Sequence, residues 1–129
     1  MDREMKIAYK IWLENNGKAF GEGPFQLLRM VVKKGSLLQA AKSLGMSYQK
    51  AWVIIHMCEE RLGFALLERK IGGIAGGGSQ VTEAGQEFLE NYGRFRQEAE
   101  RKINAIFQKY FGRSAPVVPV KTRKKERSH

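Results

Sequence analysis

The fold of this chain is decided by residues 35–62, which read GSLLQAAKSLGMSYQKAWVIIHMCEERL. The stretch predicts two short helices around a tight turn. Gly45 ends the first helix, over about 37–44, because glycine adopts the left-handed backbone of a helix C-terminus without a Cβ clash. Ser47 begins the second, because its side chain can accept a hydrogen bond from the first turn. The expected inward residues of the first helix are Leu38, Ala40 and Ala41. This pattern predicts a helix-turn-helix, whose second helix enters the major groove of DNA.

The composition narrows the class of partner. A chain of 129 residues suits one domain with extensions. Its net charge of +10 favours a polyanion, either nucleic acid or an anionic membrane surface. Half of that charge lies in residues 112–129, and we expect this basic tail to be disordered unless bound. The tail either adds non-specific DNA affinity or serves only as a solubilising end.

Several classes of function are disfavoured by what the sequence lacks. Cys58 is the only cysteine, so no intrachain disulfide can form, which suits a reducing compartment. There is no apolar run of membrane-spanning length and no signal-peptide core at the N-terminus, so we expect a cytoplasmic protein without a membrane partner. His56 and Cys58 are too few for a metal site, and no nucleophile–base pair stands out. We therefore expect no enzyme, no metal and no cofactor.

The segments before the helix-turn-helix predict a strand and a helix. Residues 5–14 alternate in polarity, with one apolar face, which predicts a half-buried strand. A turn signal at 15–18 follows, and Pro24 lies near the first turn of a helix that Gly35 stops. The apolar residues of this helix expected to pack on the helix-turn-helix are Phe25, Leu28, Val31 and Val32.

The segments after it predict a wing and a long helix. Residues 66–71 and 80–82 are expected to pair as a β-hairpin around the glycine-rich tip 72–79. That tip lacks the lysine of a Walker A loop and has no dinucleotide-binding glycine pattern, so a flexible wing is preferred over a nucleotide site. Thr82 is the expected N-cap of a helix reaching about 110, roughly 42 Å long. A rod of this length with an apolar stripe is most simply buried against a second copy of itself. The expected dimerisation residues are Phe88, Tyr92, Phe95, Ala99, Ile103, Ile106 and Tyr110.

Residues 35–92 also carry a family resemblance. The residues concerned are Gly35-Ser36, Ala40-Ala41-Lys42, Gly45-Met46-Ser47-Tyr48, Ala51-Trp52, Leu67-Glu68-Arg69, the glycines within 72–78, and Val81-Thr82 with Gly85. With them, the stretch resembles the N-terminal DNA-binding domain of the molybdate-responsive ModE regulators, in the LysR-like class. The resemblance implies a winged helix that regulates transcription. ModE-type regulators also carry C-terminal domains that bind the oxyanion between subunits, whereas this sequence has the basic tail there, so we do not expect it to sense molybdate.

The predicted DNA-contacting residues lie on the helix-turn-helix and the wing. They are Ser36, Gln39, Ser47, Tyr48, Gln49, Lys50, Val53, Arg69, Lys70, Gly76 and Ser79. Gln can pair with adenine and Lys with guanine, so DNA contact is preferred for Gln49 and Lys50 over a merely solvated helix face. Ser36 and Ser47 either cap their helices or also meet phosphates.

Three further positions have competing interpretations. Tyr48 either contacts the DNA backbone or packs on the wing. Arg69 and Lys70 reach flanking phosphates or the minor groove, or are merely solvated. Trp52 is expected in the core, beside Ala51, where it would bury a large apolar area.

Together these observations predict a mainly α fold with a small β component, a winged helix-turn-helix with a long C-terminal dimerisation helix. We expect a DNA-binding domain over 1–81 with its wing at 66–81, the dimerisation helix over 82–111, and the tail over 112–129. The expected function is sequence-specific transcriptional regulation by a homodimer on a palindromic operator in double-stranded DNA. Two alternatives stay open: an architectural DNA-binding protein of low specificity, and a molybdate or oxyanion-binding protein by family association.

Overall fold

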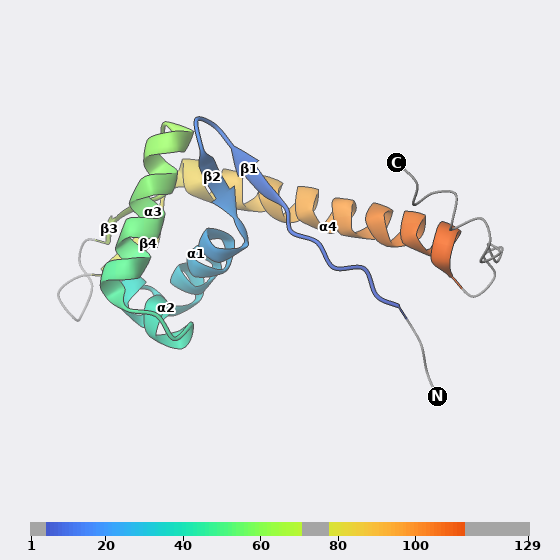
Figure 1. The fold of residues 1–129 in the computed structure, drawn as a ribbon. Coiled ribbons are helices and arrows are strands. Elements are labelled where there is room, and N and C mark those ends of the chain that lie inside the picture. The colour runs from blue at the N-terminus through green and yellow to red at the C-terminus, as the bar shows by residue number, and fades with distance from the viewer. Residues whose placement is uncertain (1–4, 71–77, 113–129) are drawn as a thin grey trace. The chain divides into compact units, whose positions relative to one another are not determined.

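The structure is a computed structural model that describes residues 5–70 and 78–112. It divides into two compact units, Lys10–Arg96 and Met1–Tyr9 with Gln97–His129. The elements follow in the order β1 (Trp12–Glu14), β2 (Lys18–Gly21), α1 (Glu22–Lys34), α2 (Leu37–Ser43), α3 (Tyr48–Leu62), β3 (Leu67–Lys70), β4 (Gly78–Val81) and α4 (Glu83–Phe111). Figure 1 shows this order as a ribbon. The predicted fold class, a mainly helical winged helix-turn-helix with a long last helix, is confirmed.

The helix ends follow the local signals in the sequence. Ser36 Oγ accepts a hydrogen bond from Gln39 N at 3.0 Å, and Ser47 Oγ accepts one from Lys50 N at 3.1 Å. Both contacts satisfy N–H groups that have no partner within the first turn of a helix. Gly35 and Gly45 have φ values of +81° and +71°, the left-handed backbone that lets the chain leave α1 and α2. The predicted caps and stops around the helix-turn-helix are therefore confirmed.

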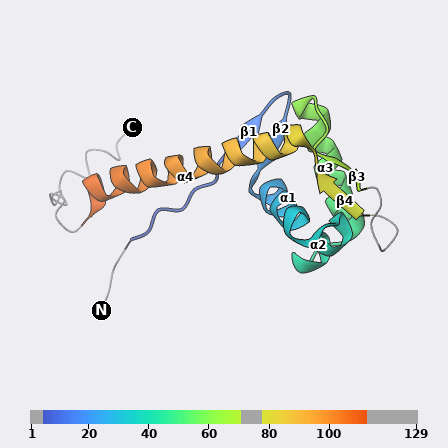
Figure 2. The same cartoon turned by 180° about the vertical axis from the view of Figure 1, so that it is seen from behind.

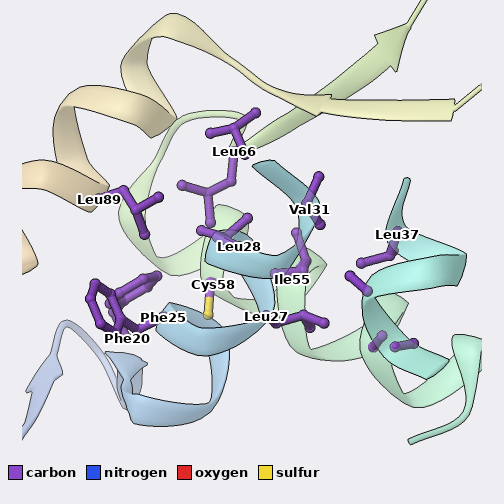
Figure 3. Close-up of a cluster of buried hydrophobic side chains, with 14 of the residues drawn as sticks. Phe20, Phe25, Leu27, Leu28, Val31, Leu37, Ile55, Cys58, Leu66 and Leu89 are labelled. Carbon is purple, nitrogen blue, oxygen red and sulfur yellow. The ribbon is translucent and has the colours of Figure 1, made fainter. Parts of the chain in front are cut away.

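The core of Lys10–Arg96 lies where α1, α2 and α3 meet. Figure 3 shows side chains from these three helices converging with Leu66 and Leu89. The residues with no more than 1% of their surface exposed include Phe20, Leu27, Leu28, Val31, Ala40, Ala41, Ala51, Ile55 and Leu66. Each large aliphatic side chain buried in this way stabilises the fold by about 1.5–3 kcal/mol. The core thus fixes the orientation of α3 relative to α1 and α2.

An aromatic cluster holds the beginning of α4 to the rest of this unit. The Phe20 ring meets the rings of Phe88 and Tyr92 edge-on, with centroids 4.8 and 4.9 Å away. Edge-to-face pairs of this kind add to the free energy gained from burial. Further along α4, Arg96 Nε and Nη2 donate to the two carboxylate oxygens of Glu22, at 2.7 and 2.9 Å. This pair ties α4 to the first residue of α1.

Three predictions about the packing were wrong. Regular strand structure covers only Trp12–Glu14 of the strand predicted over 5–14. Trp12 already pairs with Gly21, the last residue of β2, so β2 supplies no partner for the residues before Trp12. Leu38 and Val32, predicted to face inward, are 46% and 52% exposed. In α2 the inward stripe is instead formed by Leu37, Ala40 and Ala41, which share one face at helical spacing.

Candidate nucleic-acid interface

The helix α3 turns one face to the core and leaves the other free. Its buried residues are Ala51, Ile55 and Cys58, spaced by four and three as one helix face requires. The residues of its first turn, Tyr48 to Lys50, are all exposed. In Lys10–Arg96, α3 is therefore anchored along one side and presents its N-terminal turn outward.

A groove of about 890 Å³ lies where the beginning of α2, the beginning of α3 and the β3–β4 hairpin come together. It unites five of the predicted DNA-contacting residues: Ser36, Gln39, Tyr48, Arg69 and Ser79. Lys34, Leu38 and Gly78 also line it, and sequence reasoning did not select them for the site. The sequence did contain a signal for Lys34, because it is a basic residue directly before Gly35, where α1 ends.

A second hollow, of about 600 Å³, lies beside the first turn of α3. Ser47, Tyr48, Gln49 and Trp52 line it, so Tyr48 borders both hollows. Lys50 and Val53 are exposed on α3, and Lys70 is exposed on β3, but they line neither hollow. Gly76, the remaining predicted contact, lies outside the described residues.

The prediction that Trp52 belongs to the core was wrong. Trp52 is 45% exposed, and its ring stacks on that of His56 with a centroid distance of 3.7 Å and an interplanar angle of 18°. The physical reason is helical phase: Ala51 occupies the buried stripe, and the next residue is rotated by about 100° away from it. The site thus gains an aromatic side chain that sequence reasoning had assigned to the interior.

The wing is fixed to α3 through Glu59. One carboxylate oxygen, Oε2, accepts hydrogen bonds from the backbone N–H groups of Leu66 and Leu67, at 2.7 and 3.1 Å. Hydrogen bonds to a charged acceptor are stronger than those between neutral groups. The chain that enters β3 is therefore held directly by the recognition-helix candidate.

The other strand of the wing is fixed at the turn between α1 and α2. Ser79 N donates to Gly35 O at 3.3 Å, and Lys70 pairs with Gly78 across the antiparallel hairpin. A Cβ placed on Gly78 would lie 2.6 Å from Gly35 O, so only glycine fits this approach of two backbones. In Figure 2 the hairpin lies beside α2 and α3. These contacts set the width of the groove.

The ionisable groups give the interface a positive character. Lys34 and Arg69 line the groove, and Lys50 and Lys70 are exposed on α3 and β3, while the Glu68 carboxylate accepts a hydrogen bond from Gln80 Nε2 at 3.0 Å. Cys58 is not part of this surface: burial raises the pKa of its thiol to about 11, although the charge of Arg61 opposes the shift. Within residues 5–70 and 78–112, no group of three or more His, Cys, Asp or Glu side chains could hold a metal ion.

The residues predicted to form a dimer interface divide into two groups on α4. Phe88 and Tyr92 pack against Phe20 in their own chain, and Tyr92 is only 3% exposed, so they leave little surface for a partner. Phe95, Ile106 and Tyr110 are 47%, 57% and 60% exposed, and Ala99 and Ile103 are half-buried. The dimerisation role of these five residues stays a prediction.

Three helices, the second and third joined by a tight turn, followed by a two-stranded wing, define the winged helix-turn-helix class. Residues 24–86 match the model of the bacterial regulatory helix-turn-helix proteins of the LysR family. This part of the chain is therefore a LysR-type helix-turn-helix domain. A solved structure of the CbnR DNA-binding domain in complex with DNA is similar, with a TM-score of 0.52 and 29% identity, covering 64% of this chain and 88% of that one.

Curated relatives also match this chain. The molybdenum-pterin-binding protein MopB of Rhodobacter capsulatus is 30% identical over 104 residues, which are 81% of this chain and 38% of MopB. The transcriptional dual regulator ModE of Escherichia coli K12 is 32% identical over 80 residues, 62% of this chain and 30% of ModE. The chain thus spans about a third of the length of these relatives. Among the described residues, no helix combines the length and apolar character needed to cross a membrane.

Proposed function

We propose that the protein is a sequence-specific DNA-binding transcriptional regulator that acts as a homodimer in the cytoplasm, and that it is not an enzyme. The observation that carries the proposal is the groove in which Ser36, Gln39, Tyr48, Arg69 and Ser79 meet. These residues come from three separate elements, and each has a side chain that can donate to a phosphate or a base edge. The LysR-type domain and the DNA complex of the similar CbnR domain support the same conclusion.

In this proposal the first turn of α3 enters the major groove. Gln49 and Lys50 are exposed there, where Gln can pair with adenine and Lys can donate to guanine. Ser36 and Gln39, at the beginning of α2, meet a phosphate, and Arg69 on β3 meets a flanking one. Phosphate contacts set the register of the protein on DNA, and base contacts supply the specificity.

The proposed dimer uses α4 from Phe95 onward. Phe95, Ile106 and Tyr110 are exposed at helical spacing, and two copies of such a stripe can bury each other. A two-fold dimer would read two half-sites, so its operator should be an imperfect palindrome. Ile106→Glu should give a monomer in analytical ultracentrifugation, while Asn104→Glu, an exposed position off the stripe, should stay dimeric.

The recognition surface is tested with the double variant Gln49→Ala/Lys50→Ala. The operator is first selected from random DNA with the parent protein. We expect the variant to lose the preference for this operator over bulk DNA while keeping the parent's unfolding temperature and dimeric mass. The matched control, Gln97→Ala/Arg101→Ala, removes a Gln and a basic residue from exposed positions on the side of α4 away from the apolar stripe and should bind normally. Unchanged operator affinity in the first variant would refute the assignment of α3.

A second candidate function is an architectural protein with little sequence preference. The net charge of +10 favours it, since neutralised phosphates give affinity for any DNA. Competition between the selected operator and genomic DNA separates the two functions. A specific regulator binds its operator about 10³-fold or more tightly than other DNA, whereas a ratio near unity favours the architectural function.

A further inference from the structure

The exposed face of α3 is more aromatic and apolar than polar base recognition requires. Tyr48, Trp52, Val53 and Met57 are 49%, 45%, 44% and 44% exposed. Tyr48, Trp52 and His56 follow each other at intervals of four, which places them in one row along the helix. The residues assigned to base contact, Gln49 and Lys50, lie in the first turn of α3 only. Trp52 and His56 lie further along the helix, and no role has yet been assigned to them.

Trp52 is held in place although it is exposed. Its ring stacks on His56, and His56 Nδ1 lies 2.9 Å from Trp52 O. A backbone carbonyl can only accept, so Nδ1 carries the proton and donates. The other ring nitrogen, Nε2, lies 3.7 Å from Glu59 Oε1, the carboxylate whose second oxygen holds the wing. The indole is thus oriented before any ligand arrives, which lowers the entropy lost on binding.

We infer that Trp52 reads the C5-methyl group of a thymine in the operator, an inference that rests on the proposed function. The thymine methyl is the apolar feature by which a base pair in the major groove is recognised through packing. Trp52 lines the same hollow as Gln49, three residues earlier. At 1.5 Å per residue they are about 4.5 Å apart along α3, close to the 3.4 Å spacing of base pairs. Trp52 therefore reads a base at or beside the one that Gln49 contacts.

The methyl group can be removed without changing hydrogen bonding, because deoxyuridine has the same base-pairing edge and the same O4 acceptor as thymidine. Each thymine of the selected operator is replaced in turn by deoxyuridine, and the affinity is measured by fluorescence anisotropy. We expect one or two replacements per half-site to weaken parent binding about fourfold, the effect of one buried methyl group. The others should change it little.

Substitution of Trp52 assigns the methyl contact to that residue. In Trp52→Ala the same deoxyuridine replacements should leave the DNA affinity unchanged, because the thymine methyl group has lost its partner. Trp52→Leu, which has a smaller apolar side chain, provides a second test. The matched control is Trp12→Ala, because Trp12 on β1 is exposed to a similar degree, 44%. It should keep the full fourfold sensitivity. The unfolding temperature and dimeric mass of each variant establish that it is folded.

The possible results separate this inference from the proposed function. If the parent selects no consensus from random DNA, the proposed function fails, and the inference fails with it. If a consensus is found but no thymine is sensitive to methyl removal, or the sensitivity persists in both Trp52→Ala and Trp52→Leu, the inference is wrong while the proposed function stands. Unchanged parent-like binding by Trp52→Ala would assign the exposed indole to a protein partner and would equally overturn the inference.

Discussion

The Glu59 carboxylate gives the sharpest test of how the wing is attached. Its Oε2 accepts from Leu66 N and Leu67 N, and the side chain of Glu59 is only 17% exposed. Glu59→Ala removes the acceptor of two backbone donors at once. Leu66 is fully buried, so water cannot replace the lost partner there without opening the structure. Leu67 is only half-buried, and its N–H can turn to solvent.

The magnitude follows from that difference. The Leu66 hydrogen bond to a charged acceptor is worth about 1.5–3 kcal/mol, while most of the Leu67 bond is recovered by water. We therefore expect Glu59→Ala to lower the free energy of unfolding by about 2 kcal/mol. For a domain of this size, the loss should lower the unfolding temperature by about 8–16 °C. Glu59→Gln keeps a neutral oxygen acceptor and should recover about half of the loss.

Urea unfolding followed by circular dichroism measures the effect. The midpoint of Glu59→Ala should fall by about 1 M if the slope is near 2 kcal/mol/M. The control is Glu60→Ala, which removes an exposed carboxylate one residue later on α3 and should change stability by less than about 0.5 kcal/mol. Equal stability of the two alanine variants would refute the assigned role of Glu59. So would a Glu59→Gln variant no more stable than Glu59→Ala.

Three other predictions test the remaining contacts. Gly78→Ala places a Cβ against Gly35 O, 2.6 Å away, so the wing must shift; we expect weaker DNA binding in a filter assay, with α-helical circular dichroism unchanged. Cys58, with its pKa raised by burial to about 11, should be about a thousandth ionised at pH 8 and react with a thiol reagent far more slowly in the native protein than in urea. Burial raises the pKa of Glu22, but hydrogen bonds from Gln26 and Arg96 outweigh it, and the net shift is downward. A lowered pKa stabilises the fold above the unfolded-state pKa near 4.3, so Glu22→Gln should cost up to about 1 kcal/mol at pH 7, and urea unfolding should show the difference vanishing as pH falls through the folded-state pKa.

The sequence was informative wherever a local rule decides the conformation. Ser36, Ser47 and Thr82 were predicted as caps from residue type and position, and each accepts the hydrogen bond expected of a cap. These contacts close within three residues, so no knowledge of the tertiary structure was needed. The hairpin was predictable because two short segments flank a glycine tract, but its second strand begins at Gly78, inside the predicted tip, where it pairs with Lys70.

The errors arose where a residue's neighbours come from elsewhere in the chain. Trp52 and Leu38 lie next to the buried stripes of their helices, and hydrophobicity alone does not decide which side of a stripe is covered. Residues 5–11 have the pattern of a strand, but a strand also needs a partner, and β2 ends too early to supply one. The groove itself depends on the contact between Gly35 and Gly78, which are 43 residues apart in the sequence.

Glu59 contacts both the wing and the surface of α3 that we propose reads bases. One of its oxygens fixes the backbone that enters β3, and the other faces His56, on which Trp52 stacks. The wing and the indole are therefore positioned from one carboxylate on the partly buried side of α3. A change at Gly78 displaces the wing strand that contacts Gly35, and leaves this carboxylate in place. A change at Glu59 disturbs the wing and the indole together, so it should weaken phosphate contact and methyl recognition at the same time. The distinction follows from these contacts: of the hydrogen bonds to Glu59 and to Gly35 that hold the wing, only those to Glu59 involve a carboxylate that also faces His56.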